Sequence, residues 1–156
     1  FTPLAKVEVK KIPIMGYIFK KVAVFVDRGD KESRRKSVDQ MLEHAKHGIS
    51  VMVFPEGTRN KKMEQPLLPF HSGAFRIAIE TQLPVAPFVL IGANDLMPNE
   101  KLPLRPCTMT AIFANPIETK GMTEADIPAL QQKAYDAMYD LLMQRHPKFK
   151  PKLGDI

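Results

Sequence analysis

Runs of β-branched residues alternate with runs of helical periodicity between residues 22 and 91, and this alternation constrains the fold most strongly. The run Val22–Val26 precedes a turn-forming segment at 27–30, and the run Ile49–Phe54 ends at Pro55. Between the two runs, apolar residues recur at helical spacing, at Val38, Met41, Leu42 and Ala45. A strand, a helix and a second strand in this order predict a parallel crossover.

The same alternation continues towards the C-terminus. The segment Gly73–Thr81 is typical of a helix and Val85–Ile91 of a strand, which together predict a second crossover. A further strand is expected at Cys107–Phe113, and a long amphipathic helix runs from Thr123 to Arg145. The sequence therefore predicts a single α/β domain with a largely parallel central sheet flanked by helices.

Positive charge is concentrated in the first quarter of the chain. Residues 1–37 contain 10 Lys and Arg against 4 Asp and Glu, whereas the rest of the chain balances 13 against 13. This excess indicates a surface for an anionic partner such as phospholipid head groups, an acidic cofactor or nucleic acid, the last being disfavoured because no recognition motif accompanies the charge. A single cysteine excludes an internal disulfide, and the apolar stretch Leu83–Ala93 is too short to span a bilayer.

The segment 53–60, Val-Phe-Pro-Glu-Gly-Thr-Arg-Asn, lies where a buried strand is expected to end, at the edge of the sheet that ligand sites favour. Pro55 ends the strand and Gly57 permits a tight bend, so Glu56 and Arg59 are presented on one loop. A guanidinium matches a phosphate with two parallel hydrogen bonds, and a carboxylate accepts from a hydroxyl. This pair suits a phosphorylated polyol.

The loop resembles the 1-acylglycerol-3-phosphate acyltransferase family, whose Phe-Pro-Glu-Gly-Thr-Arg signature matches Phe54–Arg59 residue for residue. The segment Val24–Arg28 is similar to the family's second block and Leu83–Phe88 to its fourth. The opening segments Ala5–Val9 and Ile12–Gly16 resemble the stretch that follows the family's catalytic block. The resemblance covers roughly residues 1–120.

The resemblance implies roles for individual residues of this chain. Arg28 and Arg59 would hold the phosphate of the acceptor, and Lys6 would add positive charge there. The acceptor pocket would be shaped by the loop residues Glu56, Gly57 and Thr58, while Pro87 would support the site structurally.

The resemblance also implies the reaction and its partners. The acyl donor would be acyl-CoA or acyl-carrier protein, the acceptor lysophosphatidic acid and the product phosphatidic acid. Neither a metal nor another cofactor is expected. The protein would work as a peripheral protein on the cytoplasmic face of an anionic membrane surface.

The family catalyses with a His followed five residues later by an Asp, and these 156 residues contain no such pair. The positions five residues after the four histidines, His44, His47, His71 and His146, are Ile49, Met52, Arg76 and Pro151. We therefore expect an acyltransferase domain over 1–146 that is incomplete at its N-terminus, with a tail at 147–156. Such a chain would bind the acceptor with little turnover.

Alternatives remain open at two places. His71 could replace the missing base, although a solvent-facing loop residue explains it as well, and His44 and His47 are expected on the exposed side of their helix. The apolar segment Ile12–Phe19, flanked by lysine pairs, suits either a lipid interface or packing against the sheet. A non-catalytic fragment that binds anionic lipid or a partner protein is the alternative function.

Overall fold

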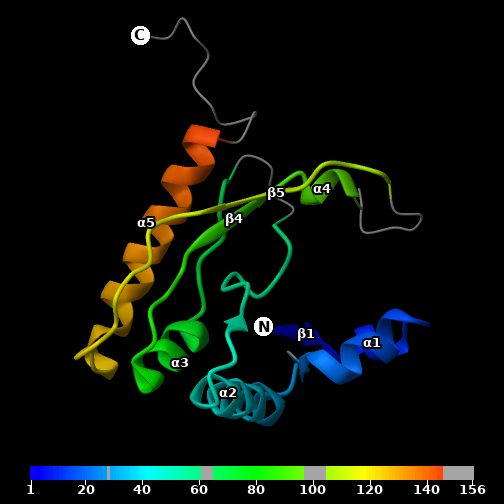
Figure 1. The fold of residues 1–156 in the computed structure, drawn as a ribbon, viewed down its shortest axis with the longest axis horizontal. Coiled ribbons are helices and arrows are strands. Elements are labelled where there is room, and N and C mark those ends of the chain that lie inside the picture. The colour runs from blue at the N-terminus through cyan, green and yellow to red at the C-terminus, as the bar shows by residue number, and fades with distance from the viewer. Residues whose placement is uncertain (28, 61–64, 97–104, 146–156) are drawn as a thin grey trace, which may run out of the picture.

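The central feature of the fold is a three-stranded parallel sheet built around the first strand of the chain. The structure, a computed structural model, describes residues 1–27, 29–60, 65–96 and 105–145. Strand β1 (Thr2–Lys6) lies between β2 (Val24–Val26) and β3 (Val51–Met52) and is parallel to both (Figure 1). The predicted crossover between 22 and 54 is therefore confirmed as parallel, with β1 inserted between its two strands.

Helix α2 (Lys31–Lys46) connects β2 to β3 and confirms the predicted periodicity. It begins because the Asp30 carboxylate accepts hydrogen bonds from the backbone N–H groups of Glu32 and Ser33, at 3.1 and 3.0 Å. Met41 and Ala45 are buried and pack with Val24 and Ile77 in one of the two hydrophobic clusters of the described residues. The apolar stripe of α2 is therefore explained by its packing against the sheet.

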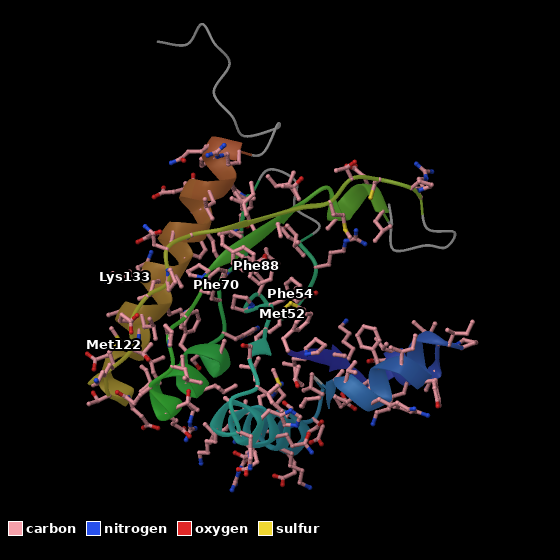
Figure 2. The ribbon with its side chains drawn as sticks, viewed as in Figure 1. Met52, Phe54, Phe70, Phe88, Met122 and Lys133 are labelled. Carbon is pink, nitrogen blue, oxygen red and sulfur yellow. The ribbon has the colours of Figure 1, made fainter. Side chains whose placement is uncertain are left out.

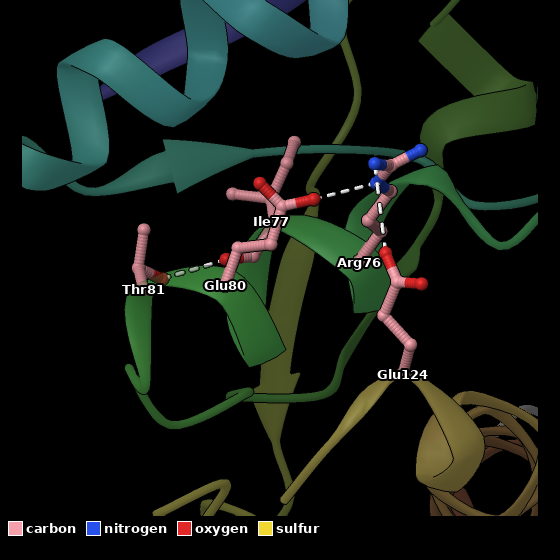
Figure 3. Close-up of polar contacts among 5 residues, drawn as sticks. All are labelled: Arg76, Ile77, Glu80, Thr81 and Glu124. Carbon is pink, nitrogen blue, oxygen red and sulfur yellow. Dashed lines mark hydrogen bonds and ion pairs between the residues drawn. The ribbon is translucent and has the colours of Figure 1, made fainter.

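Helix α3 (Gly73–Thr81) has the predicted bounds, and its apolar side chains lie in the core. Its exposed side carries Arg76, which forms ion pairs with Glu80 one turn along and with Glu124 of η3 (Glu124–Asp126), the latter at 3.5 Å (Figure 3). Near the end of the helix, the Thr81 hydroxyl donates to the Ile77 carbonyl at 2.7 Å (Figure 3). The ion pair between Arg76 and Glu124 ties α3 to the segment that starts the last helix.

The second predicted crossover is wrong in its pairing. Strand β4 (Phe88–Ile91) pairs antiparallel with β5 (Thr110–Phe113), and within the described residues no ladder joins it to β3. Val85 forms only an isolated antiparallel bridge with Ile117, so the expected strand Val85–Ile91 is interrupted before β4 begins. The short helix α4 (Ala93–Leu96) follows β4.

Helix α5 (Ile127–Arg145) covers one face of the β4–β5 pair and confirms the predicted C-terminal helix (Figure 1). A capping box starts η3, which leads directly into α5, and the Asp126 carboxylate accepts from both the backbone N–H and the hydroxyl of Thr123. Its buried residues Leu130, Ala134 and Leu142 join Phe75 and Val89 in the larger hydrophobic cluster. The predicted tail at 147–156 lies outside the described residues.

The N-terminal segment holds elements that periodicity did not indicate. After β1 come the 3-10 helix η1 (Val7–Lys11) and α1 (Met15–Val22), so α1 takes up the first residue of the predicted strand Val22–Val26. These elements lie at the opposite end of the molecule from α5 (Figure 1). In the part of the chain that is described, no helix combines the length and the apolar character that a bilayer crossing requires.

His44 corrects another expectation. Its side chain is partly buried, and Nδ1 shares a hydrogen bond of 3.0 Å with the hydroxyl of Thr2, a buried residue of β1. His47 is exposed, as expected, and its ring lies 3.5 Å from the carboxylate of Glu43. The histidine facing β1 therefore holds α2 against the sheet.

Candidate functional site

The loop that follows β3 begins with a tight turn over Phe54–Gly57. The Gly57 N–H donates to the Phe54 carbonyl at 3.0 Å, and Pro55 occupies the second position of the turn, where its fixed φ is favourable. Gly57 has a φ of 66°, a left-handed conformation that side chains with a Cβ rarely adopt. The expected role of Gly57 in permitting a bend therefore agrees with its backbone conformation.

The His71 ring packs directly against Gly57. A Cβ atom on Gly57 would lie 2.7 Å from Cδ2 and 3.0 Å from Nε2 of His71, closer than such atoms approach. The His71 backbone N–H donates to the Pro55 carbonyl at 2.8 Å. The positive φ favours glycine here, and a Cβ would in addition force the exposed His71 ring to shift.

The loop is also closed by the segment that precedes α3. The backbone N–H of Leu68 donates to Oε2 of Glu56 at 2.8 Å, and the Asn60 side-chain amide donates to the Gln65 carbonyl at 2.6 Å. The neighbouring residues Leu67 and Phe70 are buried in the larger hydrophobic cluster. The loop is consequently anchored to the core through Glu56.

Burial dominates the electrostatics of Glu56. Its carboxyl is partly buried, and desolvation raises its pKa above the usual value of 4.5, while the hydrogen bond from Leu68 opposes this shift only in part. The proton of Glu56 is therefore held more tightly than that of an exposed glutamate. One carboxylate oxygen holds the loop closed.

Arg59 reaches from the loop to the carboxyl end of β4. Its side chain is partly buried, and Nη2 donates to the carbonyl of Ala93 at 3.3 Å. Ala93 is the first residue of α4 and lies two residues after the end of β4. Thr58 beside it is exposed. The sequence prediction that Glu56 and Arg59 share one loop is confirmed, and each side chain bonds to a different neighbouring segment.

Lys6 lies at the carboxyl end of β1, exposed, and in register with Val26 at the carboxyl end of β2. Because β1 and β3 are also parallel, the three strands direct Lys6, the residues after Val26 and the loop after β3 to one edge of the sheet. Arg28, the other predicted phosphate ligand, lies outside the described residues. Lys6 and the loop after β3 therefore share this edge because the strands that carry them are parallel.

A row of aromatic side chains adjoins the loop, and no sequence pattern indicated it. The ring centroids of Phe54 and Phe88 are 6.3 Å apart, and those of Phe88 and Phe113 are 5.2 Å apart and stacked (Figure 2 shows Phe54 beside Phe88). Phe54 and Phe113 are exposed, as is Leu90 on the same face of β4. The face of the β4–β5 pair opposite α5 is therefore apolar, and solvent reaches its outer side chains.

Pro87 precedes this row and is buried, with its carbonyl accepting a hydrogen bond of 2.9 Å from the Ala114 N–H. Among the described residues, no group of three or more His, Cys, Asp and Glu side chains could hold a metal ion. The polar side chains of the described loop are the Glu56 carboxyl, the Thr58 hydroxyl, the Arg59 guanidinium and the Asn60 amide, and the His71 imidazole packs against them from the segment before α3.

Comparisons with known proteins agree on one family. A family model described as "Acyltransferase" matches residues 1–91. The chain is 31% identical to the 1-acyl-sn-glycerol-3-phosphate acyltransferase of Saccharomyces cerevisiae over 157 residues, covering 99% of this chain and 51% of that protein. It is 31% identical to the human 1-acyl-sn-glycerol-3-phosphate acyltransferase beta over 137 residues, covering 86% of this chain and 49% of that protein.

A solved structure shares the fold. The crystal structure of the 1-acyl-sn-glycerophosphate (LPA) acyltransferase PlsC from Thermotoga maritima superposes with a TM-score of 0.65 at 23% identity, covering 90% of this chain and 56% of that one. The predicted α/β class is confirmed. The chain spans about half the length of the relatives it matches.

Replacing Gly57 by alanine tests the turn. Gly57→Ala is expected to lower the free energy of unfolding by about 1–2 kcal/mol for the left-handed backbone, plus about 0.5–1.5 kcal/mol for displacing the exposed His71 ring from its rotamer. Urea denaturation measures both. The matched control is Gly48→Ala, because Gly48 has a φ of 75° and nothing within 4 Å of the added Cβ.

Removing the ring separates the two contributions. Measured relative to the single variant His71→Ala, the double variant Gly57→Ala/His71→Ala should lack the overlap contribution and show a loss similar to that of Gly48→Ala. If Gly57→Ala and Gly48→Ala lowered the free energy of unfolding equally, the packing of His71 on Gly57 would be contradicted.

The raised pKa of Glu56 predicts a specific pH dependence. Between pH 4.5 and the raised pKa, the folded state keeps a proton that the unfolded state has released, so the free energy of unfolding falls as pH rises. Glu56→Gln keeps an acceptor for Leu68 and cannot ionise. The difference in unfolding free energy, wild type minus Glu56→Gln, should decrease from pH 4.5 upwards in urea titrations, and an increase would contradict the burial of this carboxyl.

Proposed function

Because this chain belongs to the acyltransferase family, we propose that it binds 1-acylglycerol-3-phosphate and serves the transfer of an acyl group to that lipid, giving phosphatidic acid. The acyl donor is a thioester of CoA or of acyl-carrier protein. The observation that carries the proposal is the guanidinium of Arg59, held at the carboxyl end of β4 by a loop anchored to the core.

Phosphate binding at this edge is supported by the direction of the strands. Lys6 is the last residue of β1 and Arg59 lies in the loop after β3, and in the sequence Arg28 comes two residues after Val26, the last residue of β2. A planar guanidinium can approach two oxygens of one phosphate, and ammonium groups add positive potential. We assign the acceptor phosphate to Arg28 and Arg59, with Lys6 adding positive charge.

The remaining loop residues shape the acceptor site in this proposal. Glu56 holds the loop through Leu68, Gly57 turns the chain beneath His71, and Thr58 lies exposed beside Arg59. The hydrocarbon chain of the lipid would lie along the aromatic row of Phe54, Phe88 and Phe113, of which Phe54 and Phe113 are exposed. A polar loop beside an apolar face fits a lysophospholipid, which is polar at one end and apolar along the rest.

The reaction joins the acceptor hydroxyl oxygen to the carbonyl carbon of the thioester and breaks the carbon–sulfur bond. The hydroxyl proton must reach a base, and the departing sulfur must be stabilised or protonated. In the family that the sequence resembles, this base is the His of the His/Asp pair, and the 156 residues hold no such pair. This stretch therefore supplies acceptor binding, with little turnover when it acts alone.

The acceptor is a membrane lipid, so the protein would work as a peripheral protein on the cytoplasmic face of a membrane. A soluble thioester donor would then meet an acceptor held at the bilayer surface. The positive charge of the first quarter of the chain supports attraction to an anionic surface.

Substituting Arg59 tests the phosphate site. Arg59→Ala should weaken binding of a short-chain, monomeric lysophosphatidate by about 10- to 150-fold, because a charged hydrogen-bond donor is worth about 1.5–3 kcal/mol. Arg59→Lys should retain part of the affinity. Isothermal titration calorimetry measures the dissociation constants.

The matched control is Arg145→Ala, which removes the same charge from the exposed end of α5. Its affinity should remain close to that of the wild type. Equal weakening by Arg59→Ala and Arg145→Ala would show that only net charge attracts the lipid and would overturn the assigned site.

A further inference from the structure

Helix α1 presents a stripe of apolar side chains to solvent, and the exposed Lys21 lies among them. The exposed fractions are 78% for Ile14 at its N-cap, 66% for Tyr17, 49% for Ile18 and 49% for Val22. These residues are spaced at i, i+3, i+4 and i+8, so they share one side of the helix. An amphipathic helix normally turns such a stripe towards the core, whereas here it faces outwards.

The opposite side of α1 already provides the packing that holds the helix in place. Gly16 is buried and lies so close to the Lys10 carbonyl of η1 that an added Cβ would overlap with it, and Phe19 is partly buried. The Gly16 N–H donates to the Ile12 carbonyl at 2.7 Å, which joins the two helices. The exposed stripe is therefore additional to the packing of α1 on the protein.

Positive charge lies within and beside the stripe at Lys21 and Lys20, whereas Lys10 lies on the side of α1 that packs against the protein. Residues 7–22 contain four lysines and one glutamate, a net charge of +3. The Nζ atom of Lys21 lies 4.6 Å from the centroid of the Tyr17 ring, and the Nζ atom of Lys10 lies 4.4 Å from that of Phe25. An ammonium group on a long apolar stem can remain at a polar boundary while the neighbouring side chains enter an apolar layer.

We propose that α1 is a docking surface for an anionic phospholipid bilayer. The helix lies parallel to the membrane, with Ile14, Tyr17, Ile18 and Val22 in the boundary between head groups and acyl chains. Lys20 and Lys21 contact lipid phosphates, each contributing about 1 kcal/mol of attraction, or roughly fivefold in partitioning.

Charge complementarity selects this partner over a second copy of the chain. Two copies joined through this stripe would bring two surfaces of net charge +3 face to face, which is unfavourable. An anionic bilayer satisfies both the apolar stripe and the lysines. The inference rests on the proposed function only in that the acceptor is a membrane lipid, and it assigns the docking to α1.

The chain contains no tryptophan, so a single Tyr17→Trp substitution reports on the stripe alone. With vesicles of phosphatidylcholine and about one-third phosphatidylglycerol, its emission should shift to the blue and be quenched by lipids brominated near the head group. Partitioning should be at least about 10-fold weaker on pure phosphatidylcholine. Tyr139→Trp, at an exposed position of α5, is the control and should show neither change.

Charge reversal of the exposed pair, Lys20→Glu/Lys21→Glu in the Tyr17→Trp background, should weaken partitioning by about 10-fold or more, with folding verified by circular dichroism. Three results would overturn the proposal: no emission shift for the Tyr17→Trp variant, equal quenching for the Tyr139→Trp variant, or a concentration-dependent shift without vesicles, which indicates self-association. No lysophosphatidate is present in these vesicles. Failure here therefore leaves the Arg59 binding result unaffected, and the converse also holds.

Discussion

The site depends on the closure of the loop after β3 by the segment that leads into α3. Glu56 accepts the Leu68 N–H, His71 donates its backbone N–H to Pro55, and the His71 ring lies on Gly57. Each contact links the loop to a segment whose neighbours are buried in the core, so the position of the loop follows from the packing of the domain. The partly buried carboxyl of Glu56 is destabilised in its charged form, yet it supplies the acceptor that a partly buried backbone N–H requires.

This closure explains how a parallel sheet and an antiparallel pair contribute to one surface. β1, β2 and β3 end at the same edge, and Arg59 extends from that edge to the residue that begins α4 after β4. The aromatic row from Phe54 through Phe88 to Phe113 continues the contact between the two sheets on the apolar side. The edge that carries Lys6 and Arg59 thus lies next to a partly exposed apolar face, and α1 adds a second apolar surface with its own lysines.

Local signals in the sequence were sufficient for α2, α3 and α5, because each has a helical apolar stripe, Asp30 caps α2, and the Thr123–Asp126 capping box opens η3 directly before α5. The loop at 54–59 was also predicted from its residues. Pairing was not: antiparallel β4–β5 and the central position of β1 depend on contacts distant in sequence, which local patterns do not encode. The aromatic row was hidden because all four residues of β4 are apolar, so no alternation distinguishes its two faces. The contact of His71 with Gly57 likewise joins positions that no spacing rule connects.

The central claim is that the loop after β3, together with the ends of β1 and β4, binds a phosphomonoester. It is tested most directly by a titration of the ¹⁵N-labelled chain with glycerol 3-phosphate, which carries the acceptor's head group and no acyl chain, followed by backbone amide chemical shifts. The account predicts saturable shifts at Glu56, Gly57, Thr58 and Arg59, at Lys6 and at Ala93, with α5 unchanged. Shifts confined to α1, or spread evenly over exposed lysines, would contradict it.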